Sequence, residues 1–199
     1  MIVVGLTGSI GMGKTATGKL FSKLGVPVCD ADSIVHALYD RGGAAVEPIR
    51  AVFPDVVAEG RVDRVKLGES LAVEPEGFER LESIVHPLVR QAQQDFLDRS
   101  RKKGVTLAVL DIPLLFETGR DRDVDRIVVV SASPEIQKER VMKRPGMTAE
   151  IFNALLARQL PDEEKRARAD FVVDTSKTRE HAFAQVRDIV AALMADSDH

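Results

Sequence analysis

Residues 8–15 carry the clearest chemical signal in the chain. They read Gly-Ser-Ile-Gly-Met-Gly-Lys-Thr and match the phosphate-binding pattern G-x-x-x-x-G-K-T. The glycines let the backbone turn so that successive N–H groups point inward at phosphate oxygens. Lys14 adds a positive charge for the outer phosphates, and the Thr15 hydroxyl can bind the Mg²⁺ that accompanies them. We therefore predict that this loop binds a nucleoside triphosphate.

The sequence on either side of the loop predicts the elements that position it. Residues 2–4 form a β-branched run typical of a strand, and residues 17–24 continue with helical spacing. A helix that starts after the loop would add its positive dipole end and its unpaired N–H groups to the phosphate site. The alternative is a chance glycine-rich turn, which the Lys-Thr pair and these flanks make the weaker interpretation.

Three aspartates follow two further strand-like runs. The run at residues 26–29 leads into Asp30 and Asp32, and the apolar run at residues 107–110 ends at Asp111. Residues just past the carboxyl ends of parallel strands face the ligand crevice, so Asp30 and Asp32 are expected near the phosphates if their strand lies beside the first. The alternative role is helix N-capping, and we expect one of the two to cap and the other to act. Asp111 has the pattern of an acid that helps to hold Mg²⁺.

Cations are concentrated between residues 137 and 168, although the net charge of the chain is −3. Two breaks in this segment predict two helices joined by short loops. We interpret the segment as a lid that would bring Arg140 and Arg144 to the transferring phosphoryl group and exclude water. The alternative is a solvated helix face with i,i+4 pairs such as Glu139 with Lys143. The cations of the segment are Lys138, Arg140, Lys143, Arg144, Arg158, Lys165, Arg166 and Arg168.

Residues 42–104 have a different character. They contain no strand-like run, and prolines and glycines separate several helical pieces. The last piece is amphipathic, and we expect it to begin at Pro87. A long helical insertion of this kind indicates a substrate-binding subdomain, and an ordinary set of packing helices is the alternative. His86, directly before Pro87, would be either a substrate contact or a structural residue at a helix start.

The remaining signals complete an alternation of strands and helices. Residues 126–131 and 170–174 are strand-like, residues 133–135 begin a helix, and residues 180–194 form a final amphipathic helix. This order predicts an α/β fold with a mostly parallel sheet and helices on both faces. We expect one domain with a core at about 1–40, 105–135 and 169–195, an insertion at about 41–104 and a lid at about 136–168.

Composition argues against several classes of function. The chain has 199 residues with 28 Lys and Arg against 31 Asp and Glu, no Trp and one Tyr, so it lacks the basic field and the aromatic platform of a nucleic-acid-binding protein. No run approaches the ~18 apolar residues of a membrane span, and the apolar start lacks the features of a signal peptide. The single cysteine, Cys29, fits a reducing compartment and is expected to be a buried structural thiol. We expect a soluble, cytoplasmic monomer without nucleic-acid or membrane partners.

The motifs also narrow the kind of nucleotide enzyme. A GTPase would need an Asn-Lys-x-Asp motif, and the one asparagine, Asn153, does not lie in such a motif. A transport ATPase would show further signature motifs and usually a longer chain. A small kinase remains, in which a lid excludes water while an acceptor hydroxyl attacks the phosphoryl group.

The order and spacing of several motifs resemble bacterial dephospho-CoA kinases, from residue 2 to about residue 194. Three positions depart from the usual family pattern, in which a small residue, a Ser or Thr, and an Asn-x-Gly ending are common: Met12, Ala16 and the triplet at 174–176. The first two departures leave the phosphate-binding groups in place, and the third affects details near the nucleotide base. The matching motifs are Thr-Gly-Ser-Ile-Gly-Met-Gly-Lys from Thr7, Asp30-Ala31-Asp32, His86-Pro87-Leu88-Val89, Pro113-Leu114-Leu115-Phe116-Glu117, Arg158-Gln159 and Ala169-Asp170-Phe171-Val172-Val173.

This resemblance implies ATP-dependent phosphorylation of the ribose 3′-hydroxyl of dephospho-CoA, the last step of coenzyme A synthesis. Asp32 would then be the base that orients the hydroxyl, and Arg140 and Arg144 would stabilise charge on the phosphoryl group. Thr15 and Asp111 would bind Mg²⁺, and the helical insertion would bind the acceptor. The residues assigned in this way are Asp32, Lys14 and Arg140 for catalysis, Gly8, Gly11, Met12, Gly13, Lys14, Thr15, Ala16 and Arg144 for ATP, and Asp30, His86 and Leu115 for the acceptor.

Two other functions are compatible with the same loop. Another small-molecule kinase, acting on shikimate, gluconate or a nucleoside monophosphate, would share the loop and the lid, so that only a panel of acceptors would separate it. A nucleotide-gated switch or chaperone would hydrolyse ATP without an acceptor. The acid pair at Asp30 and Asp32 and the helical insertion favour an acceptor over this second alternative.

Overall fold

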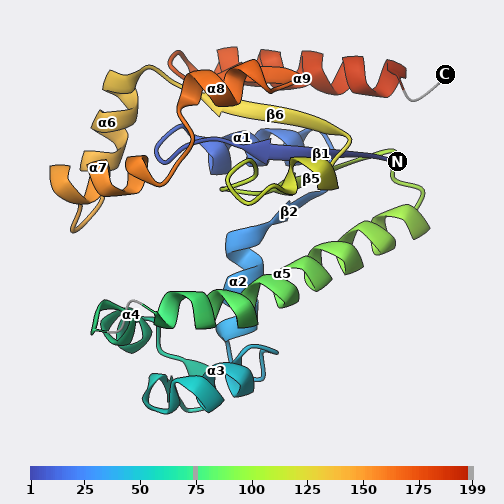
Figure 1. The fold of residues 1–199 in the computed structure, drawn as a ribbon. Coiled ribbons are helices and arrows are strands. Elements are labelled where there is room, and N and C mark those ends of the chain that lie inside the picture. Colours follow the sequence, from blue (N-terminus) through green and yellow to red (C-terminus); the bar gives the residue numbers. More distant parts are fainter. Residues whose placement is uncertain (74–75, 197–199) are drawn as a thin grey trace. The chain divides into compact units, whose positions relative to one another are not determined.

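A five-stranded parallel sheet carries the phosphate-binding loop (Figure 1). A computed structural model describes residues 1–73 and 76–196, and the chain divides into two compact units. The first unit contains Met1–Asp30 and the chain from Ser100 onward, and the second contains Ala31–Arg99. A separate cluster of buried hydrophobic side chains lies in each, so each unit has its own core.

The sheet of the first unit has the strand order β2-β5-β1-β6-β7, and all its neighbouring strands are parallel. The two strands that flank β1 are almost wholly buried, as expected for a parallel sheet covered on both faces. The predicted α/β class with a mostly parallel sheet is therefore confirmed. The strands are β1 (Ile2–Thr7), β2 (Val28–Asp30), β5 (Leu107–Asp111), β6 (Arg126–Ser131) and β7 (Phe171–Asp174).

The position of β2 decides a condition that the sequence analysis left open for Asp30 and Asp32. β2 does not lie beside β1, because β5 lies between them. The register instead pairs Asp30 with Asp111, and Leu6 of β1 with Asp111 on its other side. Two of the predicted acidic residues are thus neighbours at the carboxyl end of the sheet, where ligands bind in folds of this type.

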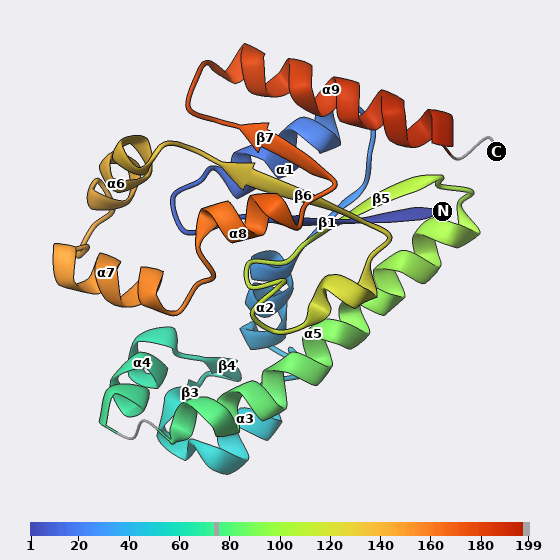
Figure 2. The same ribbon diagram turned by 45° about the horizontal axis from the view of Figure 1, so that its top comes forward.

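Two helices and a loop cover the two faces of this sheet. Helix α1 (Lys14–Lys23) and helix α9 (Arg179–Asp196) pack together and bury apolar side chains against the strands (Figure 2). On the other face, Gly5 leaves room for the side chains of Leu115 and Val124, which a Cβ atom at this position would meet at 3.2 and 3.0 Å. The loop after β5 therefore covers the face opposite α1.

The basic segment forms three helices rather than the two expected. Helix α6 (Pro134–Met142) begins where the sequence predicted a helix start, with Ser133 as its N-cap, and α7 (Ala149–Ala157) begins with a Thr148 N-cap. A short third helix, α8 (Asp162–Ala167), follows Pro161. The sequence did not predict this helix, because its six residues are too few to show a periodic apolar pattern.

The second unit is mainly helical and is organised around a long helix. Its elements are α2 (Ala31–Tyr39), α3 (Val46–Val52), the 3₁₀ turn η1 (Pro54–Val56), β3 (Val57–Ala58), β4 (Arg61–Val62), α4 (Arg64–Val73) and α5 (Gly77–Lys102), whose last residues belong to the first unit. No helix in the described ranges is long and apolar enough to cross a membrane.

Helix α5 corrects the prediction that a helix begins at Pro87. The helix starts ten residues earlier, at Gly77, and Pro87 lies inside it. A proline in a helix interior normally costs about 3 kcal/mol, because it lacks an N–H group and its ring meets the preceding turn. Here the buried positions Val85, Val89 and Leu97 recur at multiples of four residues, so the tertiary packing of one face outweighs the local preference.

A two-stranded antiparallel hairpin, β3–β4, lies where no strand was expected. Its turn residues Glu59 and Gly60 both have positive φ, at 51° and 75°. This is the conformation of the tight turns that join two strands with the natural twist. Strands of two residues are too short to show an alternating pattern, and for this reason the sequence did not reveal them.

Candidate active site

The phosphate-binding loop connects β1 to α1 with a backbone that requires glycine, as Gly8 and Gly13 illustrate. A Cβ atom at Gly8 would lie 2.5 Å from the backbone oxygen of Val130, so the loop passes against β6 without a side chain. Gly13 has a φ of 96° and directly precedes α1. Helix α1 then starts at Lys14, and Thr15 and Ala16 are exposed in its first turn. The strand-loop-helix predicted for this motif is confirmed.

The Lys14 ammonium group contacts the carboxylate of Asp111. Asp111 is buried at the carboxyl end of β5, and the Lys14 side chain is 13% exposed. Lys14 belongs to the motif for the outer phosphates, and Asp111 was predicted to help hold Mg²⁺. The fold thus brings together two charged groups that are 97 residues apart in sequence.

The aspartate pair after β2 is divided between the two units. Asp30 ends β2 beside Asp111 in the register of the sheet, whereas Asp32 lies in the first turn of α2. Asp32 is exposed and Asp30 is partly buried. Asp30 therefore ends the strand in the first unit, and Asp32 follows it in the chain on the helix that begins the second unit.

Arg140 is held beside the phosphate-binding loop by the segment after β7. Its guanidinium donates to the backbone oxygen of Thr175 at 2.7 Å and to the Thr175 hydroxyl at 2.9 Å, and it lies 3.5 Å from the backbone oxygen of Gly11. The Thr175 hydroxyl in turn donates to the backbone oxygen of Met12 at 2.7 Å. Thr175 thus connects the arginine of the lid segment to the loop, a role that the sequence did not indicate.

Two glutamines of the lid segment form hydrogen bonds with the loop. Gln137 donates to the backbone oxygen of Ile10 at 2.8 Å, and the Gln159 side-chain oxygen accepts from the Ile10 amide at 3.1 Å. Gln159 belongs to the Arg158-Gln159 pair that carried part of the family resemblance, but its neighbour Arg158 is exposed. The residue of this pair that contacts the loop is therefore the uncharged Gln159.

The remaining cations of the lid segment divide into exposed and structural groups. Arg144 is exposed, and Lys143 pairs with Glu139 at 2.5 Å, as the solvated-face alternative predicted for that pair. Lys165 is fully buried, and its ammonium lies 2.8 Å from the Glu117 carboxylate. Arg168 pairs with Asp121 at 2.9 Å and lies 4.3 Å from the centre of the Phe116 ring. Lys165 and Arg168 thus connect α8 and its C-terminal end to the loop after β5.

A cavity of about 840 Å³ lies beside the loop in the first unit. Its walls include Met12, Ser133, Gln137, Asp174 and Ser176. The Ser176 amide donates to the Asp174 carboxylate at 2.8 Å, and this hydrogen bond holds the pKa of Asp174 below its usual value. The triplet that departs from the family pattern therefore supplies both the Thr175 bridge and part of a cavity wall.

Two of the predicted acceptor-binding residues have contrasting environments. His86 is exposed on α5 in the second unit, so its side chain is accessible to a ligand. Leu115 is fully buried under the sheet of the first unit, and its neighbour Leu114 is 39% exposed. The Leu115 side chain therefore packs in the core, and its assignment as an acceptor contact stays a prediction.

Comparisons with known proteins agree over most of the chain. The family model for dephospho-CoA kinases matches residues 2–181. A dephospho-CoA kinase from Agrobacterium fabrum is 57% identical over 195 residues, which cover 98% of this chain and 100% of that protein. A crystal structure of a Thermus thermophilus protein is 34% identical, covers 96% of both chains and has a TM-score of 0.81. A dephospho-CoA kinase structure from Campylobacter jejuni, 22% identical with a TM-score of 0.69 over 96% of both chains, shares the fold.

Proposed function

The chain belongs to the dephospho-CoA kinase family, and from this premise we propose how its residues divide the work of the reaction. The activity is the ATP-dependent phosphorylation of dephospho-CoA, which gives CoA and ADP. We assign the ribose 3′-hydroxyl as the acceptor group. The observation that carries the proposal is the contact between Lys14 and Asp111 at the phosphate-binding loop, in a chain that matches the family from residue 2 to residue 181.

ATP is proposed to bind at the loop of residues 11–16, with its phosphates on the backbone amides and on Lys14. The base and sugar of ATP would occupy the cavity of about 840 Å³ beside Met12, because this cavity lies against the same loop. Its volume is within the range of about 300–1,000 Å³ that small-molecule sites have. The polar groups of Asp174 and Ser176 in its wall could then contact the base.

Thr15 and Asp111 are the residues that would hold Mg²⁺. They supply a hydroxyl and a carboxylate oxygen, which are the hard ligands that this ion prefers. Among residues 1–73 and 76–196, no group of three or more His, Cys, Asp or Glu side chains forms a metal cluster. This fits Mg²⁺, which usually binds through one or two protein ligands and completes its shell with water and phosphate oxygens. When bound, the ion would neutralise charge on the phosphates.

Asp32 is proposed as the base that orients the acceptor hydroxyl and accepts its proton. It is an exposed carboxylate directly after the carboxyl edge of the sheet, where ligands of α/β folds bind. Arg140 is proposed to stabilise the negative charge of the transferring phosphoryl group, since hydrogen bonds already hold its guanidinium beside the loop. Arg144, exposed at the end of the same helical segment, would assist when ATP is bound.

The second unit is proposed to bind the acceptor, with Asp30 and His86 among its contacts. Asp30 immediately precedes this unit and His86 is exposed on its longest helix. The segment of α6, α7 and α8 would act as the lid that excludes water from the phosphoryl group. We further propose that the protein works as a monomer in the cytoplasm.

A direct assay tests this function. Purified protein is supplied with ATP and Mg²⁺, and ADP release is measured with dephospho-CoA, shikimate, gluconate, AMP or no acceptor. We expect stimulation by dephospho-CoA alone, with one CoA formed for each ADP. Stimulation by a different acceptor would overturn the choice of substrate, and release that is indifferent to every acceptor would favour a nucleotide-gated switch.

A further inference from the structure

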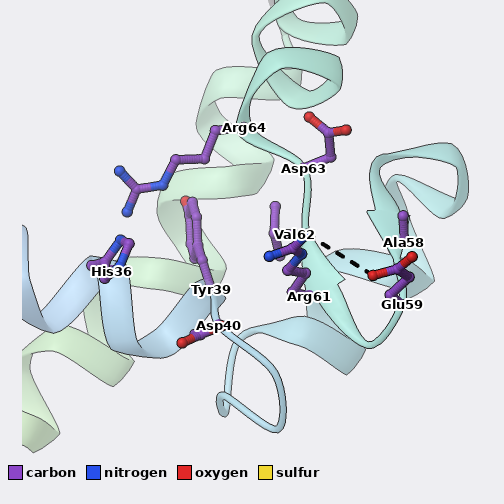
Figure 3. A pocket seen from close by; sticks show the side chains of 9 residues that line it. All are labelled: His36, Tyr39, Asp40, Ala58, Glu59, Arg61, Val62, Asp63 and Arg64. Atoms are coloured by element: carbon purple, nitrogen blue, oxygen red, sulfur yellow. Dashed lines mark ion pairs between the residues drawn. The ribbon is translucent and has the colours of Figure 1, made fainter.

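The second unit contains a cavity of its own, of about 420 Å³. It lies between the end of α2, the hairpin β3–β4 and the start of α4, and all the residues of its wall belong to the second unit (Figure 3). The functions assigned above use none of these residues. The wall is rich in groups that can donate hydrogen bonds, and these donors determine which class of ligand would bind there.

Three of these donors lie together. Figure 3 shows Arg64 and His36 on the same side of the Tyr39 ring, and the Arg64 guanidinium lies 5.4 Å from the centre of that ring. His36 and Tyr39 are three residues apart on α2, so they occupy the same face of the helix. The ring of Tyr39 is buried, and burial raises the pKa of its hydroxyl, which therefore stays protonated and can donate.

The acidic residues of the same wall already have partners. The Asp63 carboxylate accepts from the amides of Val65 and Lys66 at 3.0 and 3.2 Å, at the start of α4. Asp40 accepts from the Arg41 amide at 2.8 Å. Both carboxylates therefore already accept hydrogen bonds from nearby backbone amides.

The two arginines of the wall differ in whether a carboxylate lies next to them. Arg61 lies 3.9 Å from Glu59, and Figure 3 shows it on the other side of the Tyr39 ring from the Arg64 guanidinium. For Arg64, no ion pair with a carboxylate occurs within residues 1–73 and 76–196. Its guanidinium is thus the cation of this cavity that remains available to a ligand.

We propose that Arg64, Tyr39 and His36 form a binding site for the diphosphate group of the acceptor. Dephospho-CoA carries a diphosphate between its adenosine and its pantetheine arm, and this group offers negative charge and several oxygen acceptors. An arginine can bind two phosphate oxygens at once, and a tyrosine hydroxyl and an imidazole N–H supply further donors. The inference rests on the proposed function and deepens it, because it names the part of the acceptor that the second unit recognises.

The test compares Arg64→Gln with Arg50→Gln. Arg50 is exposed on α3 in the same unit and pairs with Glu47 at 3.2 Å, so its loss changes the net charge equally without touching the cavity. We expect Arg64→Gln to raise the KM for dephospho-CoA about 10- to 100-fold, as the loss of a charge-assisted hydrogen bond predicts. The KM for ATP and the kcat at saturating dephospho-CoA should stay within about twofold, and Arg50→Gln should match the wild type.

A binding measurement separates a diphosphate site from a general effect on the unit. Calorimetric titrations with dephospho-CoA and with adenosine, which lacks the diphosphate, are carried out on wild type, Arg64→Gln and Tyr39→Phe. Both variants should lose affinity for dephospho-CoA and keep their affinity for adenosine. An equal loss for both ligands, or an unchanged KM for dephospho-CoA in Arg64→Gln, would overturn the inference while leaving the kinase activity of the wild type established. A wild type that does not phosphorylate dephospho-CoA would refute the proposed function itself.

Discussion

The Lys14 ammonium contacts the buried carboxylate of Asp111, so that the two charges at the phosphate-binding loop are partners of each other. Both groups have proposed ligands of their own, the outer phosphates for Lys14 and Mg²⁺ for Asp111. Binding of ATP with Mg²⁺ would therefore replace one ion pair by two new charge interactions. The pair keeps both side chains at the end of the sheet where these ligands are expected to bind.

Substitution of Asp111 tests its proposed role as a Mg²⁺ ligand. Asp111→Asn keeps the shape of the side chain but removes the negative charge that binds the ion. We expect kcat/KM to fall by about 10²–10³, comparable to the loss of one group that stabilises the transition state. Turnover measured across a series of Mg²⁺ concentrations should also show a higher Mg²⁺ requirement. An unchanged Mg²⁺ requirement would contradict the assignment.

Substitution of Asp32 tests the general base. Asp32→Asn should lower kcat by about 10²–10⁴, the usual range for loss of such a group, because the amide cannot accept the proton of the acceptor hydroxyl. ATP affinity, measured by titration in the absence of acceptor, should remain near the wild-type value. Asp55→Asn, at an exposed aspartate of the same unit, is the matched control. Full turnover in the Asp32 variant would remove it from the mechanism.

Thr175 offers a test of how Arg140 is positioned. Thr175→Val keeps the volume of the side chain and removes the hydroxyl that connects Arg140 with the backbone of Met12. Hydrogen bonds to charged groups contribute about 1.5–3 kcal/mol, so we expect kcat to fall about 10- to 100-fold, while Thr175→Ser stays close to wild type. In an Arg140→Ala background the valine substitution should have little further effect on kcat. Independent, additive losses would show that Thr175 does not act through Arg140.

The ion pair between Lys165 and Glu117 makes a prediction about stability. Lys165→Met leaves the partly buried Glu117 carboxylate without its cation, and removal of one partner of a buried pair typically costs about 3–5 kcal/mol. For a chain of this size, each kcal/mol lowers the melting temperature by about 2–4 °C. The double variant Lys165→Met with Glu117→Gln should recover much of this loss. A melting temperature of Lys165→Met equal to that of the wild type would mean that the pair does not stabilise α8.

The same pair should make stability depend on pH. Burial alone would raise the pKa of Glu117, but the Lys165 ammonium and the Leu160 amide outweigh it, so the pKa lies below the ordinary value of 4.5. A lowered folded-state pKa contributes stability above the unfolded value, and this contribution is lost as the pH falls through the folded value. The difference in unfolding free energy between wild type and Glu117→Gln, measured by urea titration, should therefore be largest well above pH 4.5 and should shrink as the pH falls below that value. A constant difference over this range would refute the linkage.

The sequence predicted the elements whose signals are local. The loop at residues 8–15, the strand that ends in Asp111 and the helix that begins after Ser133 are all present, because each depends on residues that are adjacent in the chain. The contacts of Thr175 with Met12 and of Gln137 with Ile10 join residues more than 120 positions apart, and no local pattern records them. Pro87 shows the reverse case, since its local signal was clear and the packing of α5 overrode it.

The burial of individual side chains could not be predicted from the sequence either. Lys165 was counted among the cations of a lid, but the fold places it against Glu117 with no exposed surface. Leu115 was expected to contact the acceptor, and its side chain is fully buried beneath the sheet. In both cases the side chain's neighbour comes from a distant segment, and the chemistry of the residue alone does not reveal whether it meets solvent or protein.

The strand order has a consequence for how the chain folds as it is synthesised. Strand β1 ends at Thr7, but both strands that flank it, β5 and β6, begin only at Leu107 and Arg126. During translation from the N-terminus, Ala31–Arg99 is complete before the first strand can acquire any neighbour. The strand that leads into the loop at residues 8–15 therefore gains its first neighbour only after about 100 further residues have been made, which takes roughly 5–20 s at typical elongation rates of 5–20 residues per second. The core of the second unit lies within one continuous stretch, so this unit is free to fold first. Once folded, it shortens the flexible chain between β2 and β5, and the sheet then forms at a lower cost in loop entropy.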